Sequence, residues 1–243
     1  GAVLVVTEFV DPAGFYGAAN WPLTQYMVQL IQNGFSLSLI IVITYYTAEV
    51  VWRERSTGIG DIIDSMPVNN FTFWFSKLLA VTLVIIALLL VGMLATMANQ
   101  LSKGYMNFDL AQYAISLIYF TALPFILLTI LAFFIQALSP NKYVGMLIFV
   151  GYFFVSLAFS ELGLEHNMFQ FSASPSMQYS DMNAYGWALT TQHYYMLYWG
   201  AFALVLAAFS FAMWQRGPDT NLKGRIALLG YNLGRTGQTL VII

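Results

Sequence analysis

Five apolar runs, each about as long as a membrane is thick, constrain this chain more than any other feature. They lie at about 34–52, 78–98, 113–138, 143–160 and 194–214. An α-helix needs about 20 apolar residues to cross a hydrocarbon layer of roughly 30 Å. Only 8% of the residues are charged, whereas an ordinary soluble domain carries about 25%. The sequence therefore predicts an all-α integral membrane protein, a polytopic helical bundle with five complete spans.

The polar interlude 49–77 separates the first two spans. Within it, four apolar residues recur at i, i+3, i+4 and i+7, namely Ile59, Ile62, Ile63 and Met66. This spacing puts them on one face of a short helix, which Pro67 ends. An amphipathic helix between two spans needs a surface to rest on, either the lipid headgroups or another protein.

Glu49 lies in the last turn of the first span, four residues before Arg53. An acidic residue within a span is a functional candidate. A Glu followed by Arg at i+4 is also an ordinary stabilising pair of a helix. We favour the second interpretation and expect a structural ion pair between Glu49 and Arg53.

The basic residues predict the orientation of the chain. With 49–77 on the cytoplasmic side, eight of the nine Lys and Arg residues lie inside and only Lys103 lies outside. The eight are Arg53, Arg55, Lys77, Lys142, Arg216, Lys223, Arg225 and Arg235. By the positive-inside rule, we expect the Gly1 end and 161–193 outside, and the Ile243 end inside, at a bacterial inner membrane.

Two stretches outside the spans have their own expected place. Residues 161–193 are too apolar for a free loop and too polar to span, so we expect part of them to dip into the membrane from outside or to lie along its surface. Residues 215–243 have the pattern of a basic amphipathic tail at the cytoplasmic face. The chain begins at Gly1 without signal-peptide features, and we expect longer sequence at both ends.

Several kinds of chemistry lack their sequence signals. The chain has no cysteine, and Glu161, Glu165 and His166 do not have the spacing of HExxH, so we expect no metal site and no peptidase activity. No GxxxxGK[ST] loop or recognisable triad occurs, so neither a cofactor nor a catalytic residue is expected. A net charge of −2 gives no indication of nucleic acid. The scarcity of charge within the spans favours an apolar or amphipathic substrate.

Five short features follow one another around the interlude: Ala48-Glu49, Arg53-Glu54-Arg55, Thr57-Gly58, Met66-Pro67 and Lys77. This order resembles the first intracellular loop of type-2 ABC transporter permeases, the ABC-2 exporters. The resemblance implies that 1–214 is an ABC-2-type transmembrane domain showing spans two to six of six, with 161–193 as its outer re-entrant region.

The resemblance also implies a role for the short helix and a set of partners. It is the coupling helix, which in this family rests on the ATPase subunit. The residues implied at that interface are Arg55, Ile59, Asp61, Ile62, Ile63 and Met66. ATP and Mg belong to the partner ATPase, and a second permease half is expected, as a homodimer or pseudo-dimer.

Residues nearer the end of the chain give a narrower resemblance. The chain resembles bacterial permease spans fused to a gluzincin (M1-family) aminopeptidase in four short stretches: Tyr179-Ser180-Asp181-Met182-Asn183, Tyr185-Gly186, Tyr198-Trp199-Gly200 and Trp214-Gln215-Arg216-Gly217. The chain lacks the HExxH peptidase motif of that fusion, so peptidase activity is not carried over.

Three function classes follow. We favour the permease of an ATP-driven exporter, which works by alternating access. One alternative is a membrane anchor or scaffold that holds a soluble domain such as a peptidase. The other is an intramembrane enzyme or channel, which needs paired polar residues deep in the spans. An ATPase that stays bound during purification separates the first class from the other two.

Overall fold

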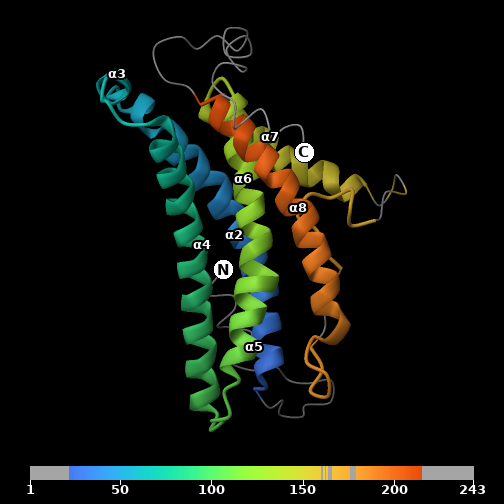
Figure 1. Ribbon diagram of the computed structural model, residues 1–243. Coiled ribbons are helices and arrows are strands. Elements are labelled where there is room, and N and C mark those ends of the chain that lie inside the picture. The colour runs from blue at the N-terminus through green and yellow to red at the C-terminus, as the bar shows by residue number, and fades with distance from the viewer. Residues whose placement is uncertain (1–21, 160, 162, 164–165, 176–178, 215–243) are drawn as a thin grey trace.

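Every described element of the structure, a computed structural model, is helical (Figure 1). The structure describes residues 22–159, 161, 163, 166–175 and 179–214. The elements are α2 (Thr24–Ser56), α3 (Gly60–Asp64), α4 (Asn70–Ser102), α5 (Leu110–Ala114), the π-helix η1 (Ile115–Ala122), α6 (Leu123–Leu138), α7 (Lys142–Ala158) and α8 (Gly186–Ala212). The expected all-α membrane bundle is confirmed.

The helices have two common ends. In Figure 1, α3 lies at the top with the end of α2 and the starts of α4 and α7, and we name this the α3 end. The start of α2, the end of α4 and α5 lie at the bottom, near the start of α8, and we name this the α5 end. Since α4 and α5 are joined there, the links 57–69 and 103–109 lie at opposite ends, as the predicted topology requires.

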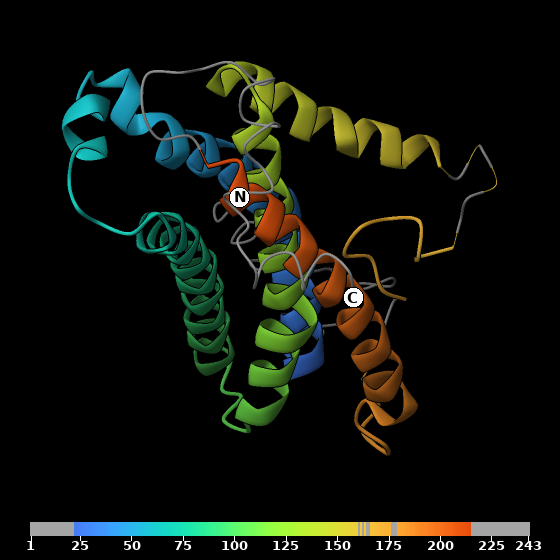
Figure 2. The same ribbon diagram turned by 45° about the horizontal axis from the view of Figure 1, so that its top comes forward.

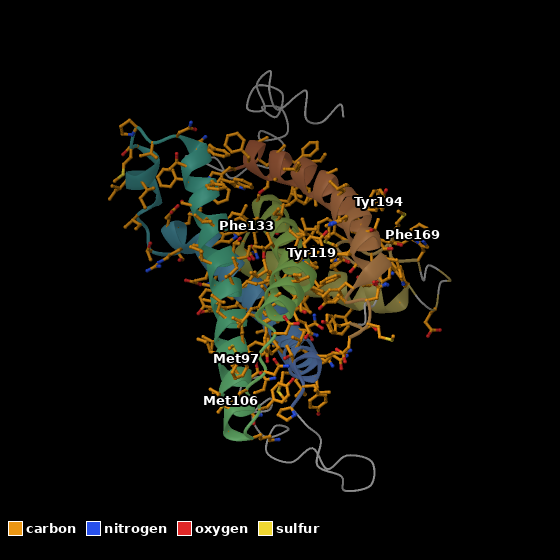
Figure 3. All side chains as sticks on the ribbon, turned by 60° about the horizontal axis from the view of Figure 1, so that its bottom comes forward. Met97, Met106, Tyr119, Phe133, Phe169 and Tyr194 are labelled. Carbon is orange, nitrogen blue, oxygen red and sulfur yellow. The ribbon has the colours of Figure 1, made fainter. Side chains whose placement is uncertain are left out.

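The core follows one stripe of each helix. On α4, Val81, Ile85 and Leu89 recur every four residues and are buried. They meet Leu39 and Ile43 of α2 and other apolar residues in one cluster. The opposite side of α4 is exposed and apolar, as a surface that faces lipid requires. The same division holds for the side chains in Figure 3, where Phe133 lies among the helices while Phe169 and Tyr194 point away from them.

Glycines end the two longest helices sharply. Gly58 follows α2 with φ +71°, and Gly104 follows α4 with φ +76°. After α2, the Ile59 N–H donates to the Glu54 carbonyl at 3.1 Å and the Gly58 N–H to the Arg55 carbonyl at 3.2 Å. This pair of bonds is a Schellman motif, which satisfies carbonyls at the helix end and favours glycine in the left-handed position. The link to α3 therefore leaves α2 in a fixed direction.

The helix that contains the first expected span is longer than its apolar run. The run 34–52 predicts only part of α2, which begins at Thr24. Its first turns carry glutamines at 25, 29 and 32, and these lower the hydropathy on which the expectation rested. The glutamines belong to a polar cavity inside the protein, so this part of α2 is helical without being uniformly apolar.

α7 differs from the expected fourth span, 143–160. Its 17 residues extend about 26 Å at 1.5 Å per residue, less than the roughly 30 Å of a hydrocarbon layer. It also leaves the bundle at a large inclination to α6 and α8 (Figures 1 and 2). Four helical stretches of the described residues are long and apolar enough to cross a membrane: Thr24–Ser56, Asn70–Ser102, Leu110–Leu138 and Gly186–Ala212.

A non-helical segment lies at the middle depth of the bundle. The Ser172 hydroxyl donates to the Pro124 carbonyl at 2.8 Å, and the Trp199 indole N–H donates to the Ala173 carbonyl at 3.1 Å. Pro124 lies halfway along the continuous rod from Leu110 to Leu138, and Trp199 halfway along α8. Part of the stretch between α7 and α8 therefore enters the bundle, as expected of a re-entrant region. The last residues of the predicted stretch, 186–193, belong to α8 instead.

Gly145 of α7 provides a test of this packing. A Cβ at Gly145 would overlap the buried Gln136 carboxamide, whereas a Cβ at Gly151 would meet open space. Gly145→Ala should lower the free energy of unfolding by about 1–3 kcal/mol, because Gln136 must move. Gly151→Ala, the matched control, should leave it unchanged or raise it by up to about 1 kcal/mol through helix propensity.

Thermal unfolding of both variants in detergent measures the difference. Equal stabilities for the two variants would contradict the described contact between α6 and α7.

Candidate functional site

The apolar stripe of α3 is exposed at the α3 end. Ile59 is 44%, Ile62 62% and Met66 46% exposed, while Ile63 is half-buried. The Ile63 N–H donates to the Ile59 carbonyl at 3.1 Å, so the helical turn includes the residue before α3. An exposed apolar stripe beside a short helix is a candidate surface for contact with lipid or another protein.

The remaining predicted interface residues lie differently. The Arg55 guanidinium lies 5.7 Å from the Trp52 ring centroid, a cation–π contact, so Arg55 packs on its own helix and is half-buried. Asp61 is part of α3, and its side chain lies outside the described part of the structure. Ile62 of α3, Ile59 directly before it and Met66 two residues after it are thus all exposed near the end of α2 that carries Arg55. We name these three residues the exposed stripe.

Lys77 joins three helices next to α3. Its ammonium lies 2.9 Å from the Glu54 carboxylate at the end of α2, and 5.1 Å from the ring centroid of Trp214, which follows α8. One turn earlier on α4, the Trp74 indole N–H donates to the buried Ser210 hydroxyl of α8 at 3.0 Å. Polar contacts therefore fix the start of α4 to the ends of α2 and α8.

The other side of the same α2 end is fixed to α6 and α7. The Trp52 indole N–H donates to the Gln136 Oε1 at 3.0 Å. The Glu49 carboxylate lies 3.4 Å from the Lys142 ammonium at the start of α7. Because Lys77 contacts Glu54, the last two turns of α2 contact α4, α6 and α7 within the α3 end.

The expected Glu49–Arg53 pair is wrong. Among the described residues the ionic partner of Glu49 is Lys142, and the Arg53 side chain is exposed. The tight turn after α6 places the first residue of α7 beside Glu49, which supplies a cation from another helix. The i+4 rule considers only one helix and does not see that competitor.

Sequence reasoning also missed Lys77, Trp74 and Lys142 as members of this site. Lys77 and Lys142 entered only as basic residues that indicate the orientation, and Lys77 also as part of the family resemblance, while Trp74 had no assigned role in this site. The signal that was available is their position: all three lie in the first turns of helices that begin at the same end as α3. We name the contacts of Glu49, Trp52 and Glu54 with Lys142, Gln136 and Lys77 the α2 clamp.

Comparison with known proteins agrees with this geometry. The family model described as ABC-2 family transporter protein matches residues 2–156, more than half of the 243 residues. The chain belongs to the ABC-2 transporter family. No curated protein and no solved structure matches it. An ABC-2 membrane domain is a transport permease that works with an ABC ATPase in a membrane.

The match includes all of α2, α3 and α4, and therefore the exposed stripe and the Lys77 contact. α8 lies beyond residue 156, yet it is fixed to the matched part by Trp74 and Ser210. The ABC-2 permease thus has a short amphipathic helix between two membrane-length helices.

The two ion pairs of the α2 clamp should differ in strength. The Lys77 and Glu54 side chains are 10% and 28% exposed, those of Lys142 and Glu49 28% and 38%. Glu54→Gln should cost about 1–3 kcal/mol, because it leaves a buried ammonium with a weaker partner. Glu49→Gln, the matched control, should cost about 0–1 kcal/mol, because its pair is longer and more exposed.

Denaturant or thermal unfolding in detergent measures both costs. A Glu49→Gln cost as large as that of Glu54→Gln would contradict the order derived from burial and distance.

Proposed function

We propose that this protein is the permease component of an ATP-driven ABC exporter, with α3 as the helix that contacts the ATPase subunit. The exposed stripe of Ile59, Ile62 and Met66 supports the proposal most directly. Three apolar side chains at the tip of a membrane protein are stabilised when a cleft of another protein covers them. Membership of the ABC-2 family makes an ABC ATPase the partner with that role.

The proposed mechanism begins on the partner. ATP and Mg bind to the ATPase, and closure of its dimer moves α3. Because the Schellman motif joins α3 to α2 in a fixed direction, the motion reaches the α2 clamp. Glu54, Trp52 and Glu49 then carry it to α4, α6 and α7, and the bundle changes between inward and outward access. This mechanism needs a second permease half, as a homodimer or pseudo-dimer, to form a pathway between the two.

The proposed membrane is the bacterial cytoplasmic membrane, with the α3 end inside. The distribution of basic residues supports this orientation: Lys77 and Lys142 lie at the α3 end, and Lys103 lies beyond α4 at the α5 end. The predicted tail 215–243 and the Gly1 end lie outside the described residues.

Ile62→Asp tests the coupling role. A charge in an apolar contact should detach the ATPase or uncouple ATP hydrolysis from transport, without affecting membrane insertion. Ile62→Leu, which keeps an apolar side chain of the same size, should behave as wild type. Co-purified ATPase and its rate of ATP hydrolysis in proteoliposomes are measured for the three proteins.

The prediction is contradicted if Ile62→Asp retains as much ATPase, with the same rate of hydrolysis, as Ile62→Leu. That result would favour lipid headgroups as the surface that covers α3, and an anchor function for the chain.

The orientation can be tested with single cysteines, because the chain has none. Ser65→Cys lies just after α3, and Met182→Cys is at a residue 99% exposed near the α5 end. A membrane-impermeant maleimide added to intact cells should label Met182→Cys, and should label Ser65→Cys only after lysis. The reverse pattern would place α3 outside and remove the proposed ATPase contact.

A further inference from the structure

A polar cavity of about 270 Å³ opens within this single chain, between α2, the η1–α6 rod and four residues before α8, namely Ser174, Pro175, Tyr179 and Tyr185. It extends from Gln25, in the first turn of α2, to Pro124, halfway along the rod. It lies far from α3, towards the α5 end. None of the described residues that line it carries a charged side chain.

One wall of the cavity is a row of glutamines on α2. Gln25, Gln29 and Gln32 follow one another at helical spacing and all line the cavity. The Gln32 Nε2 donates to the Thr121 hydroxyl at 3.0 Å, and the Gln25 Nε2 donates to the Tyr179 carbonyl at 3.0 Å. Each bond uses one of the two N–H groups of a carboxamide, which leaves its oxygen and its other N–H for further partners.

Gln112 of α5 contributes to the cavity a buried polar atom without a partner in the described part of the protein. Gln112 is 5% exposed, and among the described residues its Nε2 has no hydrogen-bond partner. It lines the same cavity. A buried amide nitrogen without a partner is costly. A group that accepts a hydrogen bond in the cavity would remove this cost.

Aromatic rings form the opposite wall. Phe120 of the π-helix and Tyr185 lie with ring centroids 4.5 Å apart, and the Tyr185 hydroxyl forms a hydrogen bond with Ser116. Burial raises the pKa of Tyr185. Burial and the Asp109 carboxylate raise the pKa of Tyr179. Both phenols therefore stay neutral at ordinary pH, and the cavity combines uncharged amides and hydroxyls with ring faces.

The cavity reaches the middle depth of the bundle, next to non-helical backbone, and such backbone is typical of places that polar molecules can reach. Non-helical backbone at membrane depth is tolerated where it is buried in protein or lines a water-filled cavity. Ser174 and Pro175 line the cavity directly after the segment that contacts Pro124 and Trp199 at mid-depth. The π-helix adds to this pattern, since π-turns occur frequently at functional sites.

We propose that this cavity is a binding site for an uncharged small molecule rich in hydroxyl or amide groups. Its side chains both donate and accept hydrogen bonds, and its rings can cover the apolar part of such a molecule. An anionic ligand would lose its hydration without meeting a cationic side chain among the described lining residues. The scarcity of charge within the spans favoured an apolar or amphipathic substrate, whereas this cavity favours a polar, uncharged ligand. The sequence pattern did not show that the three glutamines of α2 line one cavity.

Titration calorimetry of the purified protein tests the proposal without ATP or ATPase, so its result does not depend on the function of α3. Two neutral probes distinguish the ligand sources: trehalose for hydroxyl groups and N-acetylleucine amide for amide groups. N-acetylleucine is the charged counterpart of the second probe. We expect saturable binding of at least one neutral probe, and binding of N-acetylleucine at least about tenfold weaker than that of its amide if the amide binds.

Gln29→Leu is the informative variant, because the Gln29 side chain is exposed in the cavity and forms no hydrogen bond among the described residues. It should weaken binding by about 5- to 20-fold with unchanged thermal stability. Gln170→Leu makes the same chemical change outside the cavity and should bind as wild type.

The proposal is overturned if neither neutral probe binds saturably, or if Gln29→Leu and Gln170→Leu bind equally. Equal binding of N-acetylleucine and its amide would also overturn it.

Discussion

The structure depends on one constraint, which is that backbone N–H and C=O groups inside a membrane must find partners within the protein. Long helices satisfy it along their length, and the Schellman motifs at Gly58 and Gly104 satisfy it at their ends. Only the segment around Ser172 brings irregular backbone to mid-depth among the described residues, and there the side chains of Trp199 and Ser172 complete hydrogen bonds with backbone carbonyls. The polar cavity lies beside this segment, where irregular backbone at membrane depth is tolerated.

Hydropathy predicted the fold class because a span of lipid-facing helix is apolar on most of its surface. Each of the five expected apolar runs lies within a helical stretch or overlaps one for most of its length. It did not predict the first turns of α2, whose glutamines face a cavity instead of lipid, nor the inclination of α7. The inclination of a helix depends on its neighbours: Gly145 lets α7 approach Gln136 closely, and Glu49 holds its first residue. Neither contact is visible in the order of apolar residues.

The candidate site was predictable to the extent that it is local. The spacing of Ile59, Ile62 and Met66 predicted a short helix here, and all three residues are exposed, although α3 itself covers only Gly60–Asp64. The contacts that position the stripe join distant parts of the chain, such as Lys77 to Glu54 and Lys142 to Glu49. A sequence shows which residues are charged, but not which acidic residue pairs with which basic residue. The choice of Arg53 for Glu49 failed for this reason.

α2 carries residues of the proposed binding cavity and also leads to α3, the proposed contact with the ATPase. It carries the glutamine wall in its first turns and the clamp in its last, without a proline between them (Figure 1). If both proposals hold, a shift of α3 that repositions the clamp through α2 would also change the distance between the glutamines and η1. Binding in the cavity and binding of the ATPase at α3 would then be linked. Linkage is reciprocal: whatever factor the bound ATPase applies to the affinity of the cavity for its ligand, that ligand applies to the affinity of α3 for the ATPase.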